Sequence, residues 1–203
     1  DMIRQRLLKS AAAKPAAGKV TAPAATPAVV DSLGLLEHAV AKDSTKFDLL
    51  YKLGVTYLDR DKTAEAIKVF SKASQVRPKD VPTLVNLGAA YDANGRMADA
   101  QRYYRQALEL APDDSVATCR LASSLYAEAN YSAAMDLLRD AIAKRPTSYC
   151  AYFTMGVAFA DAGIYRDAIR MWKKVVALAP DSPEAVSAKE SISVLEKFVQ
   201  TQN

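Results

Sequence analysis

The side chains in this sequence best suited to chemistry are one histidine and two cysteines. His38 lies next to Glu37 and is far along the chain from Cys119 and Cys150. A zinc site needs several ligands at short spacings, and a Cys–His or Ser–His catalytic site needs a histidine beside its nucleophile. No such spacing surrounds His38, and the glycines follow no GxGxxG or GxxxxGK phosphate-binding pattern. The sequence therefore predicts no enzyme, no catalytic residue, no metal site and no cofactor.

The elements that would position any functional side chain are marked by a repeat. Prolines recur every 34 residues, at positions 78, 112, 146 and 180. Two residues after each proline stands a short polar residue that can cap a helix: Asp80, Asp114, Ser148 and Ser182. Because proline cannot continue a helix, each of these motifs predicts that one helix ends and the next begins.

Small and large residues follow the same period. Gly54, Gly88, Ala122 and Gly156 form one series, and Ala66, Ala100, Ala134 and Ala168 form a second. A bulky series comprises Phe70, Tyr104, Leu138 and Trp172. Small residues opposite large ones let stacked helices fill space without voids, so the pattern predicts an all-α repeat fold.

These positions resemble the tetratricopeptide repeat (TPR) family. The resemblance starts with Leu50, Leu53, Gly54 and Tyr57, continues through Ala66, Phe70 and Pro78, and recurs along residues 47–182. It implies a right-handed α-solenoid of antiparallel helix pairs, with repeats at 47–80, 81–114, 115–148 and 149–182. The third is the weakest copy, because Thr118 replaces a large residue. A half-repeat over 31–46, with Asp31 as helix cap, and a helix over 183–203 are expected to cover the two ends of the stack.

Charge is concentrated in the N-terminal residues. Residues 1–20 hold five basic side chains and one acidic side chain, which accounts for the net charge of +4. The neutral remainder is a poor match for the phosphate backbone, so no nucleic-acid partner is expected. The sequence has no apolar run long enough for a transmembrane helix.

Residues 1–30 read as a basic tail followed by a linker rich in alanine and proline. One interpretation is a leader without function. The other is a tether, formed by Arg4, Arg6, Leu7, Leu8 and Lys9, because such a segment resembles the stretch after a membrane anchor in bacterial envelope proteins. The tether interpretation predicts association with a membrane through a preceding segment, whereas the alternative is a cytoplasmic protein.

The resemblance implies a concave groove lined by the first helix of each repeat. The partner-binding positions are Tyr51, Val55, Val85, Asn86, Ala89, Val116, Arg120, Ser123, Tyr126, Phe153 and Val157. Cys119 and Cys150 fall on the same face of neighbouring repeats, where they are either reduced apolar groups or a disulfide. Such a groove suits a partly apolar helix or an extended segment.

Chaperone-binding members of the family hold a C-terminal carboxylate with a Lys/Asn/Asn/Lys/Arg clamp. Here the clamp positions are Tyr51, Val55, Asn86, Val116 and Arg120. Both lysines are missing, so binding of Hsp70 or Hsp90 C-terminal peptides is not expected.

The resulting hypothesis is a noncatalytic scaffold that docks or assembles subunits of a larger, membrane-associated bacterial complex through its groove and tail. Two alternatives are a soluble cytoplasmic peptide-binding adaptor and a regulatory TPR domain of a larger enzyme.

Overall fold

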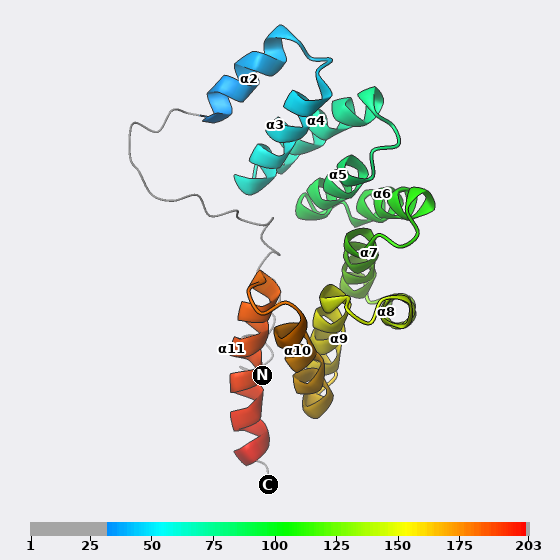
Figure 1. The fold of residues 1–203 in the computed structure, drawn as a ribbon, viewed down its shortest axis with the longest axis vertical. Helices are drawn as coiled ribbons and strands as arrows, with labels where there is room; N and C mark the ends of the chain where they lie inside the picture. Colours follow the sequence, from blue (N-terminus) through cyan, green and yellow to red (C-terminus); the bar gives the residue numbers. More distant parts are fainter. Residues whose placement is uncertain (1–31, 202–203) are drawn as a thin grey trace. The chain divides into compact units, whose positions relative to one another are not determined.

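The computed structural model describes residues 32–201, which form ten α-helices and no strand (Figure 1). The described residues divide into two compact units, an N-terminal unit over 32–124 and a C-terminal unit over 125–201. The helices of the first unit are α2 (Ser32–Lys42), α3 (Phe47–Asp59), α4 (Thr63–Val76), α5 (Val81–Ala93) and α6 (Met97–Leu110). Helix α7 (Ser115–Ala127) contains the boundary, and α8 (Tyr131–Lys144), α9 (Tyr149–Asp161), α10 (Tyr165–Leu178) and α11 (Pro183–Thr201) follow.

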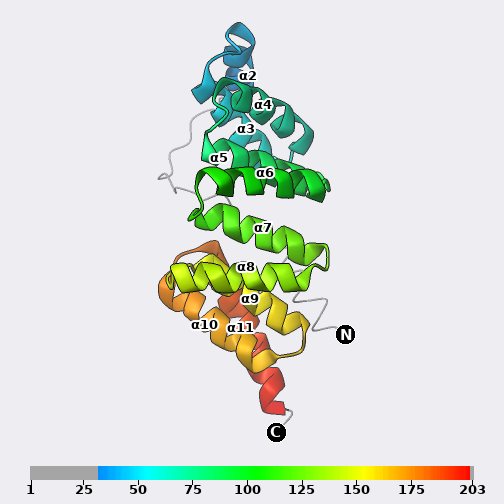
Figure 2. The same ribbon diagram turned by 90° about the vertical axis from the view of Figure 1, so that its right-hand side faces the viewer.

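Successive helices of the N-terminal unit pack as pairs, α3 on α4 and α5 on α6, as both views show (Figure 2). Helix α4 also packs on α5, and α2 packs on α3. The glycines permit this approach. A Cβ atom at Gly54 would lie 2.7 Å from the Phe70 ring, and one at Gly88 would lie 2.5 Å from the Tyr104 ring. Both rings are fully buried, so the predicted pairing of small with large residues is confirmed here.

The C-terminal unit has its own core, in which α9 packs on α10 and α10 packs on α11. Trp172 is buried against the backbone of Gly156, and its indole Nε1 donates a hydrogen bond to the Phe153 carbonyl oxygen at 3.2 Å. Ala185, Ala188 and Leu195 bring the apolar stripe of α11 into this core. The last helix therefore covers an apolar face of α10.

Three of the four predicted helix caps are present. The Asp80 and Asp114 carboxylates accept from the backbone N–H groups of Thr83 and Ala117, at 2.9 and 2.7 Å. The Ser182 hydroxyl accepts from the Ala185 N–H at 3.0 Å. The prediction is wrong for Ser148, which stands at the N-cap without a capping bond, because its hydroxyl lies 3.6 Å from the Cys150 sulfur instead.

The turns between paired helices share one backbone geometry that the proline period does not reveal. Asp61, Gly95, Ala129 and Gly163 all have a positive φ, between 59° and 79°. Around Ala129, the Ala129 N–H donates to the Tyr126 carbonyl and the Asn130 N–H to the Leu125 carbonyl. The other three turns repeat these bonds, which define a Schellman motif with a left-handed residue just after the helix.

None of the helices in the described part of the chain is long and apolar enough to cross a membrane. The predicted tether residues, Arg4 to Lys9, and the predicted cap Asp31 lie outside the described residues.

Candidate partner-binding faces

The first helices of the N-terminal unit lie side by side. Helix α3 contacts α5, and the Asn86 side-chain amide donates a hydrogen bond to the Tyr51 hydroxyl at 2.9 Å. Val55 and Ala89 are half-buried on the same two helices. The unit therefore presents predicted groove positions from two neighbouring helices on one continuous surface.

Two of the predicted positions serve mainly in packing. The Tyr51 ring contacts both Phe47 and Phe70, with centroid distances of 6.0 Å in each case. Val85 is buried, with 7% of its surface exposed. These side chains support the face, to which Val55 and Ala89 also contribute half-buried apolar side chains.

The segment of α7 in this unit supplies the most exposed apolar side chain of the predicted set. Val116 is 53% exposed, Ser123 is exposed, and Arg120 is half-buried. A branched apolar side chain left open to water beside a guanidinium group can contact a partner that is apolar on one side and polar or acidic on the other.

The remaining predicted positions belong to the C-terminal unit. Phe153 and Val157 of α9 are half-buried and pack against the core around Trp172. The Tyr126 hydroxyl donates to the Asp161 carboxylate at 2.9 Å. The Tyr126 ring lies 4.9 Å from the Tyr131 ring, and Tyr131 is 54% exposed. Tyr131 is the first residue of α8, the second helix of its repeat. The predicted positions all lie on first helices, so they did not include this exposed ring.

A polar network ties three helices of the N-terminal unit together beneath its surface. The Asp92 carboxylate accepts from the Tyr104 hydroxyl at 2.9 Å and from the Ser124 hydroxyl at 3.1 Å. Burial and the Asp92 charge raise the pKa of Tyr104 well above its usual range, so the phenol stays protonated and donates. This network positions α7 against α5 and α6, and it has no repeated counterpart in the sequence that would have predicted it.

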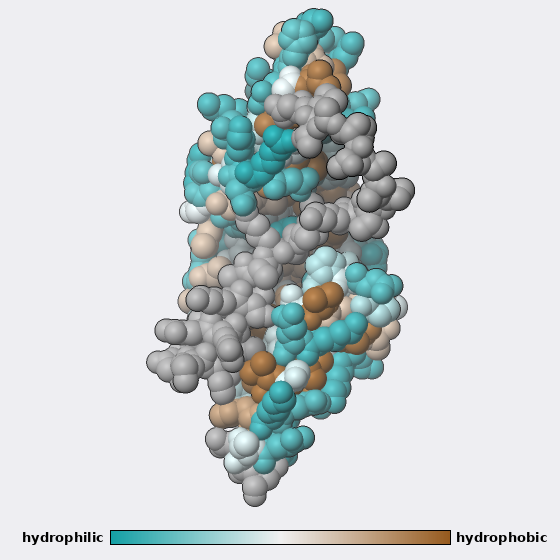
Figure 3. All heavy atoms as spheres, turned by 90° about the vertical axis from the view of Figure 1, so that its left-hand side faces the viewer, coloured by the Kyte–Doolittle hydropathy of each residue, from teal (hydrophilic) through white to brown (hydrophobic). Residues whose placement is uncertain are grey.

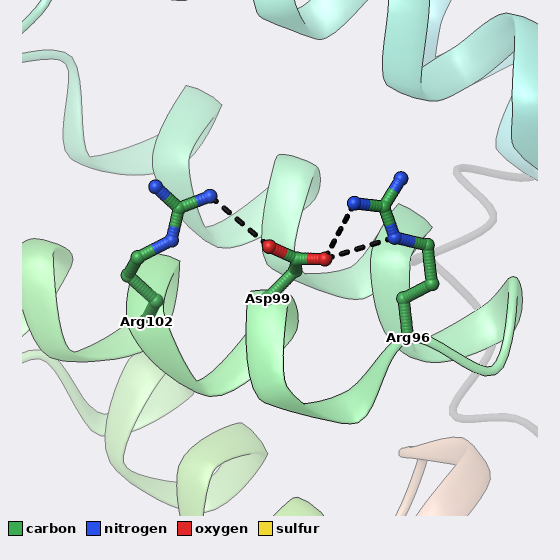
Figure 4. A network of polar contacts seen from close by, with 3 residues as sticks. All are labelled: Arg96, Asp99 and Arg102. Carbon is green, nitrogen blue, oxygen red and sulfur yellow. Dashed lines mark hydrogen bonds and ion pairs between the residues drawn. The ribbon is translucent and has the colours of Figure 1, made fainter.

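A second polar cluster lies where α5 meets α6 (Figure 4). The Asp99 carboxylate pairs with Arg96 at 2.6 Å and with Arg102 at 3.2 Å. The Arg96 guanidinium also lies over the Tyr91 ring and that of Arg102 over Tyr103, while the two rings stack at 5.4 Å. Because the two rings and the carboxylate already contact both arginines, we interpret this cluster as stabilising the turn between α5 and α6.

The chemistry-bearing side chains are not gathered into one site. His38 is exposed on α2. Cys119 and Cys150 are both disulfide-bonded, and no described cysteine is a free thiol. Among residues 32–201, no three His, Cys, Asp or Glu side chains are grouped so as to hold a metal ion.

Two family models described as tetratricopeptide repeat match the chain, one over residues 45–113 and the other over 93–150 and 125–192. Together they cover most of the chain, which therefore belongs to the tetratricopeptide repeat family. A comparison with curated protein sequences finds no match.

Solved structures agree with this fold. The crystal structure of MamA matches with a TM-score of 0.61 and 20% identity over 72% of this chain and 85% of that chain. TTC0263, a thermophilic TPR protein of Thermus thermophilus, matches with a TM-score of 0.67 and 17% identity, over 79% and 88%. YrrB, described as a TPR protein with an unusual peptide-binding site, matches at 0.57 and 23%, over 78% and 81%.

At these identities the solved structures show the fold alone, and they confirm the all-α TPR class. That class supports a protein–protein interaction scaffold, and TPR proteins are generally noncatalytic.

Proposed function

We propose that this protein docks subunits of a larger, membrane-associated complex by holding a segment of a partner protein on its N-terminal unit. The binding surface, called here the first-helix face, comprises Val55 of α3, Ala89 of α5, and Val116 and Arg120 of α7. One observation carries the proposal. Val116, Val55 and Ala89 offer accessible apolar atoms from successive first helices, and Arg120 lies on the same segment as Val116. The segment that fits is a helix or extended strand with apolar side chains and an acidic residue near Arg120. A peptide-binding site in YrrB, as its description states, supports this use of the fold.

The same face argues against capture of a chaperone C-terminal carboxylate. Valines occupy two clamp positions, and the Asn86 amide already donates to Tyr51. Arg120 alone would have to replace a set of charge-assisted hydrogen bonds. A peptide ending in a free carboxylate should therefore bind no more tightly than its amidated form.

Photo-crosslinking in the native source tests the docking face. A photoreactive amino acid at Val116 should crosslink a discrete partner, whereas the same residue at exposed Lys68 on α4 should not. With the partner purified, Val116→Glu should weaken binding about tenfold, or about 1.4 kcal/mol, by calorimetry. Lys68→Glu is the control. Equal crosslinking from both positions, or unchanged affinity in Val116→Glu, would contradict the proposal.

The membrane part of the proposal rests on the basic tail, Arg4 to Lys9. In fractionation of the native source, the protein should sediment with membranes, and replacing the three basic residues of this stretch with glutamate should release part of it. A fully soluble protein that still crosslinks through Val116 would favour the cytoplasmic adaptor. A protein found covalently joined to a catalytic domain would favour the regulatory alternative.

A further inference from the structure

A second surface, separate from the first-helix face, lies between α10 and α11 of the C-terminal unit. It is a shallow groove with Val176, Ala177 and Ile192 along its floor and Lys173, Lys189 and Lys197 at its edges. Ile192 is part of the packed core of this unit and is 9% exposed, whereas Val176, which packs against that core, is half-buried and Ala177 is exposed. Figure 3 faces the α11 side of Figure 1 and shows hydrophobic side chains between hydrophilic ones over this unit.

The repeat shows what kind of element occupies such a groove. Three periods of 34 residues earlier, the positions of Lys189, Ile192 and Ser193 are held by Leu87, Ala90 and Tyr91 of α5. Those three residues are buried, and Tyr91 stacks on Tyr103 of α6. The groove is thus the position at which a second helix packs in a complete repeat, and within the described residues no helix follows α11.

The charges at the edge specify the chemistry of the occupant. Glu196 pairs with Lys173 at 2.8 Å, so this lysine is already neutralised. Lys189 reaches only the Pro180 carbonyl oxygen, at 3.3 Å, and Lys197 has no carboxylate partner in the described part of the chain. Two basic groups therefore flank an apolar floor and have no acidic partner among residues 32–201.

We propose that this groove binds an amphipathic helix of a partner protein, with an apolar stripe on Ile192 and Val176 and carboxylates facing Lys189 and Lys197. The helix takes the place of a second repeat helix, and its acidic flanks match the two lysines. The surface is thus a docking site on the last two helices of the C-terminal unit.

Two other occupants fit the charges less well. The N-terminal residues 1–20 are themselves basic, so they would be repelled by the groove edge. In a second copy, antiparallel pairing of two α11 helices about Ser193 would place Lys189 opposite Lys197 twice. Both pairings bring like charges together.

The test uses the whole chain and a stapled peptide of about five helical turns, with leucines spaced i, i+4 and i+7 and glutamates on both flanks. Fluorescence anisotropy should give micromolar binding, and a scrambled peptide of equal composition should bind at least about tenfold more weakly. The double change Lys189→Glu with Lys197→Glu should weaken binding about tenfold at low salt, with a smaller effect at high salt. Exposed Ala177 gives a second variant, Ala177→Arg, which should block the floor.

The matched control is Arg166→Glu with Lys174→Glu, which makes the same charge change at positions of α10 outside the groove. This control and Val116→Glu should bind the peptide normally, and thermal unfolding should show that every variant folds. Absence of peptide binding, equal binding of the scrambled peptide, or unchanged affinity in both groove variants would overturn the proposal. A large gain in affinity on deleting residues 1–30 would point to that segment instead, and a dimer lost in Ala177→Arg would point to a second copy.

Discussion

Replacing Ala129 with glycine should make the protein more stable, because Ala129 holds a backbone conformation that suits glycine. Its φ is +62°, in the left-handed region, and its turn has the same Schellman hydrogen bonds as the turns at Gly95 and Gly163. The same position is thus glycine in two repeats and alanine in one.

The size of the effect follows from two opposing terms. The left-handed conformation costs an ordinary L-residue about 1–2 kcal/mol. Glycine also lowers stability by about 0.4–1 kcal/mol, because it makes the unfolded chain more flexible, and this offsets part of the relieved strain. Ala129→Gly should therefore raise the free energy of unfolding by about 1 kcal/mol, or the melting temperature by roughly 2–4 °C for a chain of this size. A side chain at Gly95 or Gly163 would meet no atom within 4 Å, so Gly95→Ala and Gly163→Ala should lose a similar amount through strain alone.

Equilibrium urea unfolding followed by circular dichroism measures these changes as shifts in the midpoint at constant slope. Ala127→Gly is the control, since Ala127 is an exposed helical residue two positions earlier, where glycine should destabilise by up to about 1 kcal/mol. If Ala129→Gly and Ala127→Gly shift the midpoint in the same direction, backbone strain at this turn is not the cause and the reasoning fails.

Three further predictions concern the core, an alkaline titration and the cysteines. Gly88→Leu should lower the free energy of unfolding by about 1–3 kcal/mol, because the leucine would overpack the Tyr104 ring. Ala93→Leu, at an exposed end of the same helix, should change this free energy little. Equal melting curves for the two variants would contradict the packing of Gly88 against Tyr104. Burial raises the pKa of Tyr57 to about 12, and the hydrogen bond from its hydroxyl to Glu37 at 2.7 Å adds to this effect. The protonated phenol therefore stabilises the fold below pH 10, and this contribution is lost as the pH rises toward 12. Tyr57→Phe should thus be less stable at neutral pH but lose less stability over that interval in urea titrations, and parallel losses would refute the assignment. Titration of the denatured, unreduced protein with a thiol reagent should find no free thiol, and two after reduction; two before reduction would exclude the disulfide.

The repeat period predicted helix positions and packing contacts because both depend on local residue types that recur. Pro180 and Ser182 mark the start of α11, and Gly54 opposite Phe70 marks a close helix pair. The left-handed turns could also have been predicted, since Gly95 and Gly163 stand two periods apart. They were missed because Asp61 and Ala129 interrupt the glycine series.

The polar contacts were not predictable in the same way. Asp92, Tyr104 and Ser124 come together from three helices, and Glu37 reaches Tyr57 from the half-repeat. Each pairing depends on side-chain rotamers and on the packing of particular helices. The family positions likewise indicated which side of a helix a residue occupies, but not that Val85 would be buried while Val116 stays exposed.

The informative residues are therefore those that break the period, and each break has a physical consequence that depends on its surroundings. Ala129 stands where two other turns have glycine, at a strained φ, so it is expected only to lower stability. Lys189 stands where the repeat has Leu87, and it turns a surface that would be buried under a helix into a basic edge of a groove. Val116 leaves an apolar side chain in water at a position that is Asp48 in the first repeat. The repeats are built by residues that recur, whereas the two proposed docking sites depend on residues such as Lys189 and Val116 that do not recur.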